Sequence, residues 1–165
     1  MEEVSISLVV GIFITLLLSA FFSGMEIAFV SSNRMLAEMD KGSSKLTRRL
    51  QTFFYKNPND FVSTMLVGNN IVLVVYGIFV ARLLDNTIFK GLDPAISVTA
   101  DTILSTLVVL FTGEFLPKTL FKSNPNKFFS FFVFPAYLFY LLLWPVSRFS
   151  TLLSKILLII SGVKV

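Results

Sequence analysis

The sequence lacks the two residue types on which most transition-metal sites and many catalytic sites depend: its 165 residues include no cysteine and no histidine. Disulfides, thiolate chemistry and zinc sites are therefore excluded. Nucleophilic mechanisms that pair a serine or a cysteine with a histidine base are excluded as well. Any bound metal would have to be held by oxygen atoms, and we do not expect an enzyme.

Charge is also scarce. Charged residues make up 15% of the chain and hydrophobic residues 55%, and the mean hydropathy is +0.80. This composition is too apolar for an ordinary soluble domain. The formal net charge of +4 is modest, and the basic residues cluster between apolar stretches. That pattern favours a role in membrane topology over nucleic-acid binding. We therefore expect a single all-α transmembrane domain over residues 1–165, with the lipid bilayer as a partner and no nucleic acid.

Three apolar stretches, residues 4–30, 61–84 and 95–116, have the length of about 20 residues that a spanning helix needs. A basic connection between spans stays in the cytoplasm, and the first connection carries six basic residues: Arg34, Lys41, Lys45, Arg48, Arg49 and Lys56. Apolar residues recur at helical spacing on both sides of Gly42, which predicts two short amphipathic helices on the cytoplasmic side. The sequence thus predicts a multi-pass protein of the cell membrane with its N-terminus outside and its C-terminus in the cytoplasm.

The fourth apolar stretch, residues 128–160, is ambiguous. Pro135 and Pro145 interrupt it, and beyond Val146 the polar residues gather on one helical face, which is typical of an interfacial helix. Basic residues lie on both sides of the stretch, so the charge rule does not decide whether residues 128–147 cross the membrane. Two alternatives stay open: a fourth span, or a kinked juxtamembrane belt.

Glu114, at the end of the third stretch, needs an explanation. A carboxylate in the hydrocarbon region costs about 2.5–3.5 kcal/mol on insertion scales, and such residues mark ion or proton paths. Pro117 has no N–H group, so it cannot donate to the Gly113 carbonyl four residues back. A carboxylate beside a free carbonyl oxygen suits a hard cation. The alternative is a structural pair between Glu114 and Lys118, one turn further on.

The other spans supply further oxygen ligands. Ser23 ends the small, hydroxyl-rich stripe of the first span, although the rest of that stripe equally suits helix packing. Asn70 shares a helical face with Ser63 in the second span. We predict a metal site formed by Ser23, Asn70, the Gly113 carbonyl and Glu114, provided that the three spans converge. The surrounding residues, or a sodium site, would be Gly24, Glu26, Ser63, Asn69 and Thr112. Oxygen ligands suit Na⁺, Mg²⁺ or Ca²⁺ without choosing among them. Asp101 we interpret as an ordinary charge at the outer interface.

Three segments carry a family resemblance: Phe22-Ser23-Gly24-Met25-Glu26-Ile27-Ala28-Phe29, Val67-Gly68-Asn69-Asn70 and Gly113-Glu114-Phe115-Leu116-Pro117-Lys118-Thr119. In this order and spacing they resemble the transmembrane domain of the CNNM/CorC family of magnesium transporters. The resemblance implies a homodimer with three spans in each subunit and a juxtamembrane belt that leads to cytosolic CBS domains. It also implies Mg²⁺ export coupled to Na⁺ entry, with the cation held by Ser23, Asn70 and Glu114. This chain contains no CBS-like segment, so we expect it to be the membrane part of a longer protein.

The residues alone leave three functions open. A secondary transporter would alternate access to the oxygen-lined site, with glycines permitting local distortion of the helices. A cation channel would need a continuous polar lining through the bilayer. A non-transporting membrane anchor or assembly module would use the same polar residues only to hold helices together. Cation-dependent stability distinguishes the last function from the first two, because a ligand that binds only the folded state stabilises it.

Overall fold

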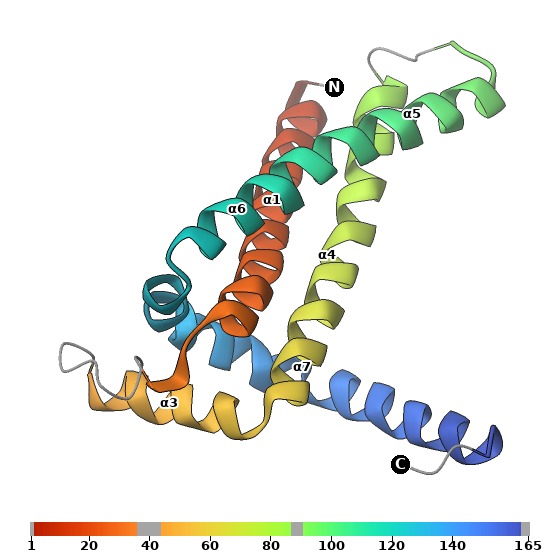
Figure 1. Ribbon diagram of the computed structural model, residues 1–165. Helices are drawn as coiled ribbons and strands as arrows, with labels where there is room; N and C mark the ends of the chain where they lie inside the picture. Colours follow the sequence, from red (N-terminus) through yellow and green to blue (C-terminus); the bar gives the residue numbers. More distant parts are fainter. Residues whose placement is uncertain (1, 36–43, 87–90, 163–165) are drawn as a thin grey trace.

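The computed structural model describes residues 2–35, 44–86 and 91–162, and the elements in these ranges are all helices (Figure 1). In chain order they are α1 (Glu2–Ser31), α3 (Lys45–Lys56), α4 (Pro58–Asn86), α5 (Pro94–Val109), the π-helical segment η1 (Leu110–Phe115), α6 (Leu116–Ser123) and α7 (Pro125–Ile160). The predicted all-α membrane architecture is confirmed.

Within the described residues, four helical runs are long and apolar enough to cross a membrane: Ser5–Ser31, Pro58–Asn86, Pro94–Ser123 and Pro125–Ile160. The first three correspond to the predicted spans, and the third runs without a break through α5, η1 and α6. The count exceeds the predicted three because α7 continues through both of its internal prolines, Pro135 and Pro145, and so qualifies by length and composition.

The arrangement of α7 favours the belt over a fourth span. It runs across α1 and α4 instead of alongside them, at the end of the bundle where α3 lies (Figure 1). The first part of α7 buries one face at helical spacing, and beyond Ser147 its side chains are largely exposed. The buried residues are Phe129, Val133, Ala136, Tyr140 and Ser147.

The helix α3 confirms the second of the two predicted amphipathic helices. The Ser44 side chain caps its N-terminus by accepting a hydrogen bond from the Thr47 N–H group at 3.1 Å, which satisfies one of the donors that a helix start leaves free. Its buried face includes Leu50 and Phe54. The first predicted amphipathic helix lies mostly outside the described residues.

Aromatic side chains join four helices at this end of the molecule. Phe61 of α4 lies 4.5 Å from Phe29 of α1, 4.7 Å from Phe54 of α3 and 5.6 Å from Phe129 of α7, measured between ring centroids. Such aromatic pairs each contribute about 0.5–1.5 kcal/mol beyond the burial of their area. The cluster holds the end of α1 against the beginning of α4.

Further along, small residues bring α1 and α4 close together. A Cβ atom added at Gly68 would lie 2.8 Å from the Phe22 ring, and one added at Gly11 would lie 2.8 Å from the Phe79 ring. Small residues allow close approach between membrane helices. The polar side chains of α1 therefore meet those of neighbouring helices at hydrogen-bonding distance.

Candidate functional site

The third spanning helix contains a π-helical turn at the predicted site. In η1 the Leu116 N–H group donates to the Phe111 carbonyl, five residues back. Pro117 immediately follows, and it lacks the N–H group that would bind the Gly113 carbonyl in an α-helix. Single π turns inside α-helices occur frequently at functional sites. Because Pro117 has no N–H group, the Gly113 carbonyl oxygen at this turn can accept hydrogen bonds from a neighbouring helix.

The Gly113 carbonyl contacts α1. The buried Ser23 hydroxyl donates a hydrogen bond of 2.7 Å to the Gly113 carbonyl oxygen. A Cβ atom at Gly113 would lie 2.9 Å from Val109 Cγ2 and 3.1 Å from Ser19 Oγ. A side chain at position 113 would therefore push the two helices apart. The structure brings two of the predicted ligands, Ser23 and the Gly113 carbonyl, into direct contact.

A second hydrogen bond joins α1 to α4 one turn away. The Ser19 hydroxyl donates to Asn69 Oδ1 at 2.7 Å, and both side chains are buried. Asn70 is exposed on the surface of this chain. Adjacent residues of a helix point about 100° apart, so only one of the two amides can face α1. The interior cluster therefore consists of Ser19, Ser23, Asn69 and Gly113, and Asn70 lies outside it.

Glu114 borders the cluster. It follows Gly113 directly and is half-buried. Its charge interacts with that of Glu26 on α1, and Lys118 supplies the opposing positive charge to Glu26. Two carboxylates and one ammonium group are thus close enough to influence one another electrostatically, near the end of α1 that approaches α3.

The other predicted surrounding residues have local roles in this structure. A Cβ atom at Gly24 would lie 2.6 Å from the Phe121 ring, so this glycine allows close packing of α6 on α1. The Ser63 hydroxyl accepts a hydrogen bond of 3.3 Å from Ser147 of α7. The Thr112 hydroxyl donates to the Val108 carbonyl at 2.7 Å.

The ligand chemistry of the cluster is that of neutral oxygen. Within residues 2–35, 44–86 and 91–162, no three acidic side chains gather as a metal-binding group. A cation bound here would be held by hydroxyl, amide and carbonyl oxygens with Glu114 as the nearest negative charge. Ser19 is not among the predicted ligands, although its position one turn before Ser23 in the small stripe is a signal that could have identified it.

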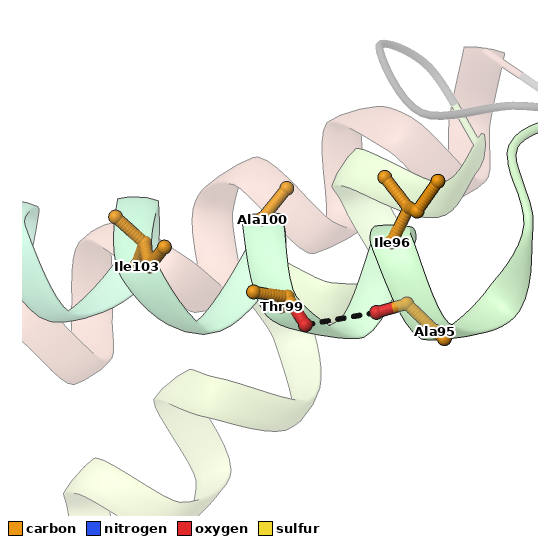
Figure 2. A pocket seen from close by; sticks show the side chains of 5 residues that line it. All are labelled: Ala95, Ile96, Thr99, Ala100 and Ile103. Atoms are coloured by element: carbon orange, nitrogen blue, oxygen red, sulfur yellow. Dashed lines mark hydrogen bonds between the residues drawn. The ribbon is translucent and has the colours of Figure 1, made fainter.

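A separate hollow on the outward face of α5 has different chemistry. Its lining comes from a single helix and is mainly apolar. The Thr99 hydroxyl donates a hydrogen bond of 2.9 Å to the Ala95 carbonyl oxygen (Figure 2). The lining residues are Ala95, Ile96, Thr99, Ala100 and Ile103. Such a surface suits an apolar neighbour and offers no set of cation ligands.

Comparison with known proteins gives a consistent result. A family described as the cyclin M transmembrane N-terminal domain (CNNM) matches residues 10–165. A "UPF0053 protein" of Haemophilus influenzae is 31% identical over an alignment of 166 positions, and the match covers 94% of this chain and 37% of the relative. The "UPF0053 inner membrane protein YfjD" of Escherichia coli is 32% identical over 111 residues, 67% of this chain and 24% of the relative. The "UPF0053 protein MG146 homolog" of Mycoplasma pneumoniae is 28% identical over 155 residues, 88% of this chain and 35% of the relative. The chain therefore spans about a third or less of the length of these relatives.

Proposed function

Since this chain belongs to the cyclin M transmembrane domain family, CNNM, we propose that it is the membrane part of a secondary transporter that exports Mg²⁺ in exchange for Na⁺. The observation that carries the proposal is the contact between the Ser23 hydroxyl and the Gly113 carbonyl at a π turn, directly beside Glu114. Broken or distorted helices whose backbone carbonyls bind ions near the bilayer midplane are characteristic of secondary transporters.

The hydrogen bonds of the cluster suggest how a cation would enter. In this structure the Ser23 hydroxyl donates a hydrogen bond to the Gly113 carbonyl oxygen, and the Ser19 hydroxyl donates one to Asn69 Oδ1. A cation would take the place of those protons after rotation of the hydroxyl groups, so that both partners of a hydrogen bond become ligands. Glu114 would supply the charge. Mg²⁺ keeps several of its waters in most protein sites, so a few protein oxygens suffice, and Na⁺ would compete for the same oxygens.

The polar stripe of α1 argues against the alternative of a cation channel. A channel needs a continuous polar lining, but the Phe79 ring packs over Gly11. The Thr15 hydroxyl donates a hydrogen bond of 2.9 Å to the Gly11 carbonyl oxygen of its own helix. The stripe is therefore used for helix packing over this part of its length. The remaining alternative, a membrane anchor or assembly module without transport, makes no use of Glu114 as a ligand.

We also propose the orientation and the assembly that the family resemblance implies. The N-terminus would lie outside and α3 in the cytoplasm, because α3 carries four basic residues and no acidic one. The chain would form a homodimer, for which the exposed apolar faces of α4 and α5 supply the surface, and the full-length protein would continue into cytosolic CBS domains. Native mass spectrometry in mild detergent measures the assembly, and a strictly monomeric mass would contradict it.

Glu114→Gln tests the transport site. The amide keeps the size of the side chain but removes the charge, so Mg²⁺ and Na⁺ affinity should fall by about tenfold or more, the equivalent of about 1.4 kcal/mol. Stability should be unchanged or higher, because a neutral amide is cheaper to hold in a membrane than a carboxylate. Calorimetric titration of the purified protein with each cation, together with thermal unfolding, gives both quantities.

Lys118→Met is the matched control, because it removes the charge one turn away. If Glu114 serves only to pair with Lys118, the two substitutions should be equally harmful. We expect Lys118→Met to be milder, since Pro117 disturbs the turn between them. Undiminished cation binding by folded Glu114→Gln protein would refute the site, and a wild-type protein that binds neither cation would favour the anchor module.

A further inference from the structure

Two carboxyl groups meet at the end of the bundle opposite to α3. Asp85 lies in the last turn of α4, and Asp101 lies in the second turn of α5, which packs against α4 (Figure 1). Asp101 and Ser97 are both buried, with 5% and 7% of their surface exposed, whereas Asp85 is exposed. Ser97 and Asp101 are four residues apart and therefore share one face of α5.

The polar atoms of this group are incompletely satisfied. The Ser97 hydroxyl donates to Asp85 Oδ1. The Asp101 carboxyl is hydrogen-bonded to that of Asp85, yet its Oδ1 atom is buried without a hydrogen-bond partner among the described residues. A buried carboxylate oxygen without a partner is costly, and a second carboxylate beside it adds repulsion. A proton shared between the two carboxyl groups would relieve the repulsion, whereas a bound cation would relieve the repulsion and also give Oδ1 a partner.

We propose that Asp85, Ser97 and Asp101 form a second cation site, suited to a hard divalent ion such as Mg²⁺, at the end of α4 and α5 far from α3. The three side chains offer only oxygen, which hard cations prefer, and their two carboxylates balance a charge of +2. The exposure of Asp85 leaves a path to water, from which Mg²⁺ would keep part of its hydration shell. The site shares no residue with the cluster around Gly113, and it stands whether or not that cluster transports ions.

The basic residue next to the pair offers an alternative explanation. Arg82 is exposed and lies three residues before Asp85 on α4, so it is close enough in the helix to neutralise Asp85. If the arginine were the partner of the carboxylates, Arg82→Gln should weaken the packing of α5 on α4. If a cation is the partner, Arg82→Gln should leave Mg²⁺ binding intact or strengthen it, because a competing positive charge has gone.

The test is a set of four proteins: the wild type, Glu114→Gln, Asp101→Asn and the double variant. Calorimetric titration with Mg²⁺ should detect a site that survives Glu114→Gln and whose affinity falls at least tenfold when Asp101→Asn is added. Without added cation, Asp101→Asn should raise the midpoint of thermal unfolding, since the repulsion is gone, while the increase of that midpoint on adding Mg²⁺ should shrink. A structural role alone would not produce opposite changes in these two measurements.

Two further variants keep the test decisive. Asp85→Asn changes an exposed side chain, so it should fold and should lose the same Mg²⁺ binding. Asp60→Asn removes a carboxylate from the other end of the same helix and should not affect this site. Mg²⁺ affinity that is unchanged in both Asp101→Asn and Asp85→Asn would overturn the proposal. Loss of binding in Glu114→Gln alone, with nothing left to be removed by Asp101→Asn, would overturn it while leaving the transport site in place.

Discussion

Ser19 and Ser23, one turn apart on α1, each donate one hydrogen bond to a different neighbouring helix. Hydrogen bonds between membrane helices contribute only about 0.6 kcal/mol on average. The two contacts therefore stabilise the bundle only slightly, and a cation that replaced them, as proposed above, would cost little of the helix packing energy. Weak hydrogen bonds between the ligands would suit a transport site, because its ligands must both bind the cation and release it.

Substitution of the two adjacent asparagines should separate stability from binding. Asn69→Ala removes the acceptor of the buried Ser19 hydroxyl, so we expect it to destabilise the protein by about 1–2 kcal/mol. Asn70→Ala alters an exposed side chain and should change stability by less than about 0.5 kcal/mol. Unfolding in detergent, followed by circular dichroism, measures the difference, and equal effects of the two variants would contradict the assignment of Asn69 to the interior.

Cation titration of Asn69→Ala and Asn70→Ala then shows which of the two amides is a cation ligand, because only the loss of a ligand should weaken binding. The sequence could indicate that one asparagine faces a neighbouring helix, because adjacent side chains diverge by about 100°. It could not indicate which one, because Ser63 shares a face with Asn70 and yet bonds to Ser147 of α7. The rotation of α4 about its axis is set by the packing of Phe22 over Gly68, a contact that no local pattern reveals.

At the level of elements, the π turn of η1 lies just before Pro117. Pro117→Ala restores an N–H group whose α-helical acceptor is the Gly113 carbonyl. We expect the third span to become more stable, since proline costs about 3 kcal/mol relative to alanine in a helix interior. We also expect Mg²⁺ binding to weaken, because the restored N–H group competes with Ser23 and with a cation for the same oxygen.

Pro125→Ala is the control for that substitution. Pro125 begins α7, where a backbone N–H group has no helical acceptor, so its replacement should change little. Thermal unfolding and Mg²⁺ titration of both variants decide the matter. Weaker binding in Pro117→Ala that comes with lower stability would point to a packing defect, and unchanged binding would show that the free carbonyl is not a ligand.

The elements differ in how well the sequence predicts them. Hydropathy located the spans, and the basic amphipathic pattern located α3, because both patterns reflect the solvent that a helix face meets. Pro135 and Pro145 suggested breaks in α7, yet the helix continues through both. The face of α7 that includes Phe129, Val133 and Tyr140 packs on the bundle, and this packing offsets the cost of the prolines. The pairing of Asp85 with Asp101 was missed because it depends on where α5 crosses α4.

At the scale of the whole molecule, the bundle changes character along its length. Aromatic rings from four helices pack at the α3 end, small and hydroxyl-bearing residues line the middle, and two carboxyl groups meet at the far end. If the protein transports ions as proposed, a well-packed end and a weakly hydrogen-bonded middle would allow the helices to move apart on one side while staying joined on the other. The two candidate cation sites would then lie at different depths of the same membrane domain.

The orientation of this bundle in the membrane can be tested with cysteines, because the chain has none of its own. The N-terminal end of α1 and the far end of α4 lie together, opposite to α3 (Figure 1). Positive residues are retained in the cytoplasm, so Ser5→Cys and Leu92→Cys should react with an impermeant thiol reagent in intact cells. Leu46→Cys, on the exposed face of α3, should react only after the cells are permeabilised. Labelling of position 46 from outside, with positions 5 and 92 protected, would invert the proposed topology and would place the carboxyl pair of Asp85 and Asp101 on the cytoplasmic side.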